Sequence, residues 1–228
     1  MSTIAQEAIL TQIMAARPAV HPTREGQSRC IGLHSEVLKF LYQQLSPKQR
    51  TLETGCGLST LVFALAGCQH QSIVPNQEHI DATRQSAEQY QISLDQTSFI
   101  VARSEFVLPT LSQPHPLDVV LIDGGHAFPL PFIDWFYTTQ HLRVSGLMIL
   151  DDTHLKTVSI LHRFLCQQPG WSEVFHIHQT AFFRKTHDQV TDEWDYWRTQ
   201  PFNQTWRSRL YQLKTLWRKT VSGQSSEK

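Results

Sequence analysis

The chain has 228 residues, of which 40% are hydrophobic and 18% charged, and this size and composition fit one α/β domain with a modest extension. Its 20 basic and 20 acidic side chains cancel, so we expect no attraction to nucleic acid. No apolar run reaches the roughly 18 residues of a membrane span, and residues 1–20 lack the apolar core of a signal peptide. The 4 cysteines show no metal-pair or disulfide-framework spacing, so we expect reduced thiols in a cytoplasmic protein.

Hydrophobic periodicity predicts two helices near the N-terminus. Ile4–Ala16 has apolar residues at helical spacing and ends before Pro18, and Leu33–Leu45 is a second helix. The polar stretch His21–Arg29 between them is expected to be a loop. We therefore predict a helical extension over residues 1–46.

From residue 47 to residue 187 the pattern predicts a single α/β domain. The strand-like runs are Thr51–Thr54, Ser72–Val74, Ser98–Ala102, Leu117–Ile122 and Gly146–Leu150. The helix-like segments are Ser59–Ala66, Gln77–Gln89, Glu105–Leu111, Leu130–Leu142 and Leu155–Gln167. Strands that alternate with helices predict a parallel sheet with helices on both sides. Trp171–His178 and Ala181–Lys185 break the alternation and predict an antiparallel pair at one edge.

A glycine-rich turn joins the first of these strands directly to a helix, in the sequence Glu53-Thr54-Gly55-Cys56-Gly57-Leu58-Ser59-Thr60. Such a turn presents backbone N–H groups and a positive helix end to a ligand. Dinucleotide-binding enzymes use G-x-G-x-x-G here, but Thr60 replaces the third glycine, which weighs against hydride transfer. The alternative is a tight turn with no ligand. Glu53 before the glycines and Ser59 at the helix start favour a cofactor.

Acidic residues follow two of the predicted buried strands. Asp123-Gly124-Gly125-His126 follows Leu117–Ile122, and Asp151-Asp152 follows Gly146–Leu150. Neighbouring parallel strands end at the same rim of a sheet, where ligands bind. Three carboxylates would repel one another there unless a cation sat among them, and a hard ion such as Mg²⁺ prefers oxygen ligands. The alternative for Asp151 and Asp152 is capping of the next helix.

These motifs resemble those of class I S-adenosylmethionine-dependent methyltransferases, in particular small bacterial members similar to the metal-dependent O-methyltransferases. The resemblance covers about Leu33–Lys185. It implies a doubly wound, mostly parallel, seven-stranded Rossmann-like sheet with helices on both faces and an antiparallel edge strand. It also implies S-adenosylmethionine as cofactor and methylation of a hydroxyl on a small molecule.

The resemblance assigns roles to individual residues. Glu53 would hold the amino-acid end of the cofactor, and Gly55 and Gly57 would let the backbone approach it. His126 would be a general base, acting with Asp123. The implied cofactor-binding set is Glu53, Gly55, Cys56, Gly57, Ser59, Asn76 and Asp123, and the implied metal ligands are Asp123, Asp151 and Asp152.

One position departs from the family pattern. The family carries an acid at the end of the second strand, where it binds the ribose hydroxyls, but this chain has Val74. Losing a hydrogen bond to a charged partner costs roughly 1.5–3 kcal/mol, or about ten- to a hundredfold in affinity. Asn76, Gln77 and Glu78 are the candidate replacements. Val74 therefore keeps open two alternatives on the same fold, a hydroxylase-like or other enzyme and a binding protein without catalysis.

Two aromatic segments remain. Phe128–Tyr137 is expected to be a helix packed on the sheet, with Phe128 as an alternative wall of an acceptor pocket. Residues 188–228 form a predicted tail in which apolar side chains of Thr205–Thr220 fall on one helical face opposite five basic residues. We expect this tail to pack on the domain or on the second copy of a homodimer, with membrane contact as the less favoured alternative.

Overall fold

The computed structural model describes residues 3–18, 21–22, 28–29, 32–188, 200–204, 206, 210 and 213–214. The strands of the main sheet are β3 (Arg50–Thr54), β4 (Gln69–Val74), β5 (Thr97–Val101), β6 (Leu117–Ile122), β7 (Leu142–Leu150), β8 (Trp171–Ile177) and β9 (Thr180–Lys185). The helices are α1 (Thr3–Ala16), α2 (Ser35–Gln44), α3 (Leu58–Leu65), α4 (Gln77–Gln89), α5 (Ser104–Val107), α6 (Leu130–His141) and α7 (Lys156–Gln167), with 3-10 turns η1 (Leu108–Thr110) and η2 (Pro201–Asn203).

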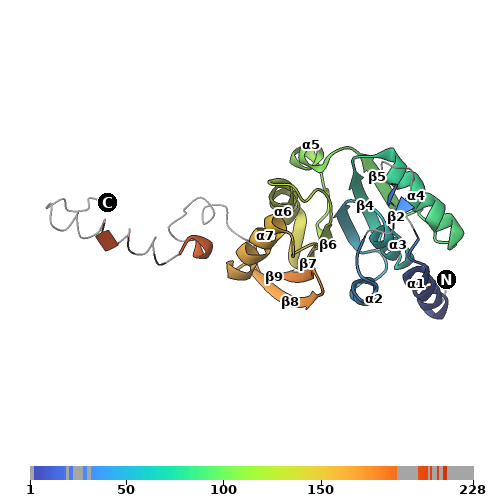
Figure 1. Ribbon diagram of the computed structural model, residues 1–228, viewed down its shortest axis with the longest axis horizontal. Coiled ribbons are helices and arrows are strands. Elements are labelled where there is room, and N and C mark those ends of the chain that lie inside the picture. The colour runs from blue at the N-terminus through green and yellow to red at the C-terminus, as the bar shows by residue number, and fades with distance from the viewer. Residues whose placement is uncertain are drawn as a thin grey trace.

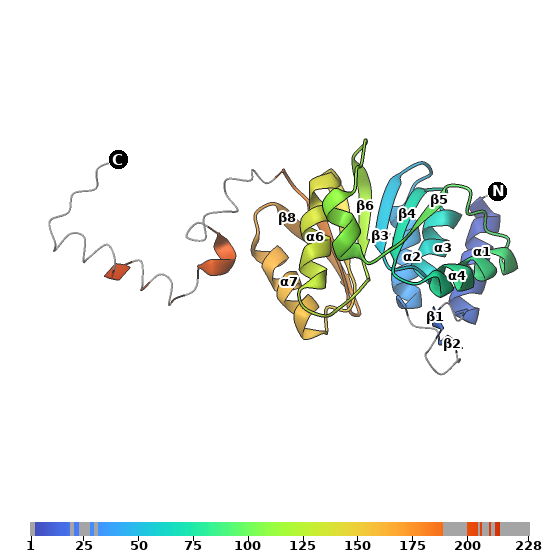
Figure 2. The ribbon, with the colours of Figure 1, turned by 90° about the horizontal axis from the view of Figure 1, so that it is seen from above.

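The seven strands form one sheet in the order β5-β4-β3-β6-β7-β9-β8. The first five in this order are parallel, and β9 pairs antiparallel with both β7 and β8. The predicted doubly wound sheet with an antiparallel edge pair is confirmed. The strand that runs against the others is β9, one place in from the edge, because the tight turn at His178 and Gln179 folds β9 back between β8 and β7. Figures 1 and 2 show α1 to α4 beside β4 and β5, and α6 and α7 beside β7 to β9.

The stretch predicted as a loop over residues 21–29 contains a short antiparallel pair, β1 (His21–Pro22) with β2 (Ser28–Arg29). The loop prediction is wrong for these four residues. Strands of two residues are too short to leave a hydrophobic alternation in the sequence.

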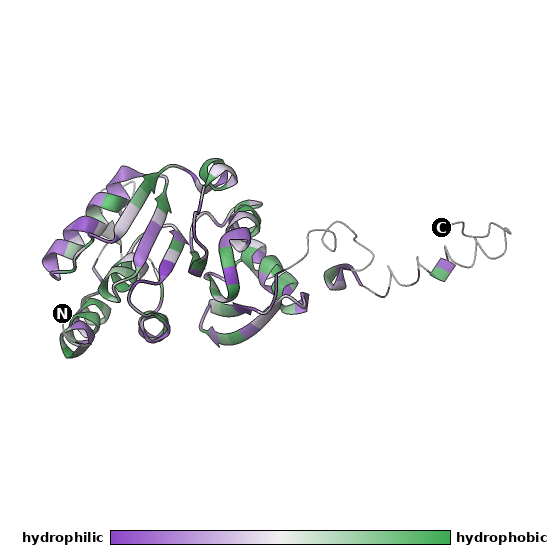
Figure 3. Cartoon of the chain, turned by 180° about the vertical axis from the view of Figure 1, so that it is seen from behind, coloured by the Kyte–Doolittle hydropathy of each residue, from purple (hydrophilic) through white to green (hydrophobic). Residues whose placement is uncertain are grey.

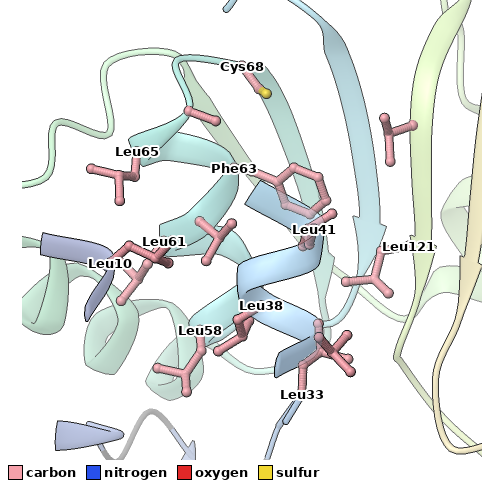
Figure 4. Close-up of a cluster of buried hydrophobic side chains, with 14 of the residues drawn as sticks. Leu10, Leu33, Leu38, Leu41, Leu58, Leu61, Phe63, Leu65, Cys68 and Leu121 are labelled. Atoms are coloured by element: carbon pink, nitrogen blue, oxygen red, sulfur yellow. The ribbon is translucent and has the colours of Figure 1, made fainter. Parts of the chain in front are cut away.

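Alternate side chains along the strands point to opposite faces of the sheet, so the sheet takes part in two separate hydrophobic cores. In β6, Val119 and Leu121 face the core built with α1, α2 and α3, whereas Val120 and Ile122 face the core built with α6 and α7. Figure 4 shows the first core, to which α1, α2 and α3 all contribute leucines, with Phe63 beside Leu41. Burial on both faces explains why β6 reads as a nearly continuous apolar run. By contrast, α4 lies at the periphery and carries a mostly hydrophilic surface (Figure 3).

Little of the predicted C-terminal tail falls within the described residues. Phe202 of η2 packs on Phe164 of α7, with ring centroids 5.4 Å apart. Trp206, Leu210 and Leu213 are exposed, and the rest of the predicted amphipathic face lies outside the described residues. Among the described helices, none combines the length and the apolar character needed to cross a membrane.

Candidate active site at the carboxyl ends of the strands

A cavity of about 600 Å³ opens where β3, β4, β5, β6 and β7 end. It therefore lies where ligands bind in open α/β sheets. Its lining residues are Gly32, Thr54, Gly55, Cys56, Ile73, Val74, Pro75, Asn76, His79, Arg103, Ser104, Glu105, Asp123, Gly124, Gly125, His126, Leu130, Asp151, Asp152 and Gln179.

Gly55 is a point of close backbone approach in the wall. Its φ is +104°, and a Cβ atom at this position would lie 2.6 Å from the backbone oxygen of Asp123. Its N–H donates to the carbonyl of Ile73 at 2.9 Å. Only glycine fits, because any side chain would be strained in φ and would collide with the neighbouring strand end.

Glu53 lies behind the turn rather than on the cavity wall. Its buried carboxylate accepts hydrogen bonds from the hydroxyls of Ser59, at 2.7 Å, and Thr60, and it lies 3.1 Å from Nε2 of His70. The Thr60 hydroxyl in turn accepts from the N–H of Gly57 at 2.9 Å. The carboxylate thus fixes the end of β3, the turn and the first turn of α3 to one another.

The predicted cofactor-binding residues divide into two groups. Gly55, Cys56, Asn76 and Asp123 line the cavity. Glu53, Gly57 and Ser59 belong to the hydrogen-bonded network behind it. The sequence could not separate the groups, because the division depends on the directions of side chains within a single turn.

The end of β4 is where the sequence has Val74 in place of the acid expected from the family pattern. Val74 is its last residue and is fully buried, but it contributes to the cavity wall. Asn76 stands at the start of α4, and its side chain forms no cap hydrogen bond to that helix. Its amide therefore remains available to a ligand in the cavity.

Asp123, His126 and Asp152 converge where β6 and β7 end. Each offers one ligand atom, and these atoms all lie within 4.8 Å of one another. Nε2 of His126 is 3.0 Å from Oδ2 of Asp152, and Gln179 donates to Oδ1 of Asp152 at 2.8 Å. Asp151 also lines the cavity, but it is buried and accepts a hydrogen bond from the Thr180 hydroxyl. The structure thus groups His126, rather than Asp151, with the other two predicted ligands.

The closeness of these carboxyl groups shifts their pKa values. Burial, followed by the charges of Asp151 and Asp152, holds the pKa of Asp123 well above its usual range. Burial also raises the pKa of Asp151. The hydrogen bond from His126 lowers the pKa of Asp152. The group therefore carries its full negative charge only at a cost, which a proton or a cation would relieve.

The end of β5 contributes residues that the sequence reading did not select. Arg103, Ser104 and Glu105 line the cavity, and Nε of Arg103 donates to Oε1 of Glu105 at 2.7 Å. The rule that selected Asp123, a polar residue directly after a predicted strand, would also have selected these three residues. His79 of α4 and Gln179 of the β8–β9 turn also line the cavity, and no strand-end rule selects them.

Phe128 does not line the cavity and is 75% exposed. The helix that follows it, α6, packs on the sheet through Trp135, which contacts Phe164 of α7 at a centroid distance of 5.1 Å. From this segment only Leu130 reaches the cavity wall.

Comparison with known proteins shows what the chain resembles. Residues 52–153 match the model of a family described as a methyltransferase domain. The match covers somewhat less than half of the chain, and the strand order with the reversed β9 is the Rossmann-like fold of methyltransferases. A comparison with curated protein sequences gives no match.

Solved structures share the fold at low sequence identity. The O-methyltransferase TomG from Streptomyces achromogenes, solved in complex with SAM, has a TM-score of 0.62 and 17% identity over 77% of this chain and 90% of its own. A putative caffeoyl-CoA O-methyltransferase from Staphylococcus aureus has a TM-score of 0.58 and 17% identity over 80% and 99%. An O-methyltransferase from Bacillus cereus in complex with SAH has a TM-score of 0.55 and 15% identity over 80% and 90%.

Proposed function

We propose that this protein is a methyltransferase, which transfers a methyl group from S-adenosylmethionine to a hydroxyl of a small molecule. The observation that carries the proposal is that one cavity is lined both by the Gly55 turn and by Asp123, His126 and Asp152. Support comes from the similar structures, of which the Streptomyces enzyme is described with SAM and the Bacillus enzyme with SAH.

The residues of the cavity fit S-adenosylmethionine. The bare backbone at Gly55 allows close approach, and the free amide of Asn76 offers hydrogen bonds where Val74 offers only apolar contact. The carboxylates across the cavity complement a positively charged sulfonium. When bound, this group supplies the activated methyl. We propose Asn76 as the residue that compensates for the missing acid at the end of β4.

His126 is the proposed base. Asp152 lies 3.0 Å from its Nε2, so an Nε2–H donated to that carboxylate leaves Nδ1 as the nitrogen that accepts a proton. Gln179 holds the other oxygen of Asp152 and so fixes the orientation of the pair. Removing a positioned base costs about 10²–10⁴ in rate.

The same residues fit a divalent cation. Two carboxylate oxygens and one imidazole nitrogen lie within 4.8 Å of one another. This mixed set of oxygen and nitrogen donors suits Mn²⁺ or Zn²⁺ better than it suits Mg²⁺, which prefers oxygen ligands alone. Such an ion would supply Lewis acidity towards the acceptor hydroxyl. His126 would then serve as a ligand through Nε2, so the ion and the Asp152 hydrogen bond are competing uses of that nitrogen.

A methyl-transfer assay with labelled S-adenosylmethionine and a panel of catechols and phenols tests whether His126 acts as a base or as a ligand to an ion. If an ion takes part, a chelator abolishes transfer and added Mn²⁺ or Mg²⁺ restores it. His126→Ala should lower kcat by at least about a hundredfold. His154→Ala is the matched control, because His154 also stands near Asp152, at 3.6 Å, but is more exposed. Transfer that resists the chelator would remove the ion from the proposal, and equal loss in both variants would contradict the role of His126.

The acceptor and location remain proposals. A small molecule is favoured because the cavity is compact and the chain has no net charge to attract nucleic acid. The cytoplasmic location and the homodimer rest on the sequence pattern alone.

A further inference from the structure

A second group of potential metal ligands lies outside the cavity, between α7 and β8. Nε2 of His162 is 3.0 Å from Oε1 of Glu173, and Sγ of Cys166 is 3.3 Å from Oε2 of the same carboxylate. Sγ of Cys166 is 3.7 Å from Nε2 of His162. Nδ1 of His176 is 2.9 Å from Oε1 of Glu173. None of these four residues lines the cavity.

The fold brings the four side chains to one place by two local devices. His162 and Cys166 are four residues apart on α7 and so share a face of the helix. Glu173 and His176 are three residues apart on β8, which in a regular strand would put them on opposite faces. An irregularity in the β8–β9 register between Glu173 and Phe175 restores them to the same face, and bulges commonly re-aim side chains in this way.

The distances among His162, Cys166 and Glu173 suit a tetrahedral ion, and the ligand atoms of these three residues all lie within 4.8 Å of one another. With Zn–S near 2.3 Å and Zn–N or Zn–O near 2.1 Å, ligand atoms in a tetrahedral site lie roughly 3.4–3.6 Å apart. The distances around Cys166, 3.3 and 3.7 Å, bracket that value. The two imidazole contacts to Glu173, 3.0 and 2.9 Å, would need only a few tenths of an ångström of adjustment.

The hydrogen bonds of His176 also call for a positive charge at this point. The Thr153 hydroxyl donates to the carbonyl of Gln179 at 2.8 Å, so it accepts from Nε2–H of His176 at 3.1 Å. The neutral form of His176 then points the lone pair of Nδ1 at the carboxylate of Glu173. That contact is favourable only with a proton or a cation between them.

We propose that His162, Cys166 and Glu173, with His176 turned in from its contact on the same carboxylate as the fourth ligand, form a structural site for Zn²⁺ or a similar ion. One carboxylate and one thiolate neutralise a divalent cation, and the His₂CysGlu set has the sulfur, nitrogen and oxygen donors that zinc takes. Four protein ligands close the coordination sphere, which is typical of structural rather than catalytic zinc. The ion clamps α7 to β8.

The clamp would also brace the active site from outside. Thr153 orients His176 and directly follows Asp152 in the chain. Its backbone N–H and its hydroxyl both donate to Gln179, whose amide donates to Asp152. Thr153 is therefore a positioning residue shared by the two sites, and outer-shell residues of this kind typically contribute about 10–100-fold to metal affinity.

Cobalt substitution tests the proposal on the full chain. We expect chelator-treated protein to bind Co²⁺ at this site with the intense visible bands of tetrahedral coordination and a thiolate-to-metal charge-transfer band. Cys166→Ser should lose the charge-transfer band, and His176→Gln should bind Co²⁺ at least about a hundredfold more weakly. In the Asp152→Asn background, Zn²⁺ should raise the melting temperature of the chain that keeps Cys166 more than that of the chain with Cys166→Ser.

Asp152→Asn is the control that separates this site from the active-site group. It should keep the charge-transfer band, because Cys166 is not among the residues of that group. A thiolate band that persists in Cys166→Ser, or cobalt bound only in the pale octahedral form, would overturn the proposal. Neither outcome depends on methyl transfer.

Discussion

At the scale of single residues, Asp134 is a buried carboxyl group with no role in the proposed reaction. It lies on α6 beneath the turn at Gly124, where an added Cβ would come within 3.4 Å of its Oδ2. Its neighbouring hydroxyls are those of Ser104 and Thr54, but neither of its oxygens has a well-formed hydrogen bond among the described residues. Burial is the main cause that raises the pKa of Asp134 to about 6.

This shift predicts how stability depends on pH. An unfolded Asp ionises near pH 3.9, so the folded state holds its proton more tightly between about pH 4 and pH 6 and loses stability as pH rises through that window. The full loss, about 2–3 kcal/mol, is present above about pH 6. Asp134→Asn should avoid it and so gain stability over the wild type at pH 8 but little at pH 4.

Urea denaturation of both proteins at the two pH values, with divalent metal removed, measures this difference. A stability difference that is the same at pH 4 and at pH 8 would show that the Asp134 carboxyl does not titrate as described.

At the scale of elements, the junction of β3 with α3 depends on Gly55. Gly55→Ala places a Cβ 2.6 Å from the Asp123 carbonyl at a φ of +104°, so the ends of β3 and β6 must separate. Gly67→Ala is the matched control, because φ there is +75° but the nearest atom to an added Cβ, on Pro47, is at 3.6 Å. We expect about 1 kcal/mol of destabilisation at Gly67 from backbone strain alone.

At Gly55 we expect at least about 2 kcal/mol more than at Gly67, since strain and collision add there. Chemical denaturation of the two variants provides the comparison. Equal destabilisation of Gly55→Ala and Gly67→Ala would mean that the ends of β3 and β6 separate at no cost in free energy. The close approach of Gly55 to Asp123 would then not explain why the position is a glycine.

The sequence predicted elements best where burial alone decides them. β6 and α4 match their predicted bounds, because an apolar run and a helical period need no knowledge of neighbours. β4 begins at Gln69 rather than Ser72, since His70 is buried through its contacts with Thr51 and Glu53. Such a buried polar residue carries no hydrophobic signal, and only the register of β3 against β4 reveals it.

At the scale of the whole molecule, the sheet explains which site residues were predictable. Asp123, Asp151 and Asp152 were found because parallel strands end at one rim. The grouping of His126 with Asp123 and Asp152 and the position of Glu53 behind the turn depend on side-chain directions. The pairing of α7 with β8 depends on a bulge. These features require coordinates, because no spacing rule on a single segment encodes them.

The central claim is that the cavity binds S-adenosylmethionine, and calorimetric titration tests it most directly. S-adenosylmethionine and S-adenosylhomocysteine should each bind once per chain. Asn76→Ala should weaken both by about tenfold or more, the value of a lost hydrogen bond to a charged or polar partner. Gln77→Ala is the control, because Gln77 is exposed beside Asn76 but does not line the cavity. Absence of binding by either ligand at millimolar concentration, with and without divalent metal, would contradict the account.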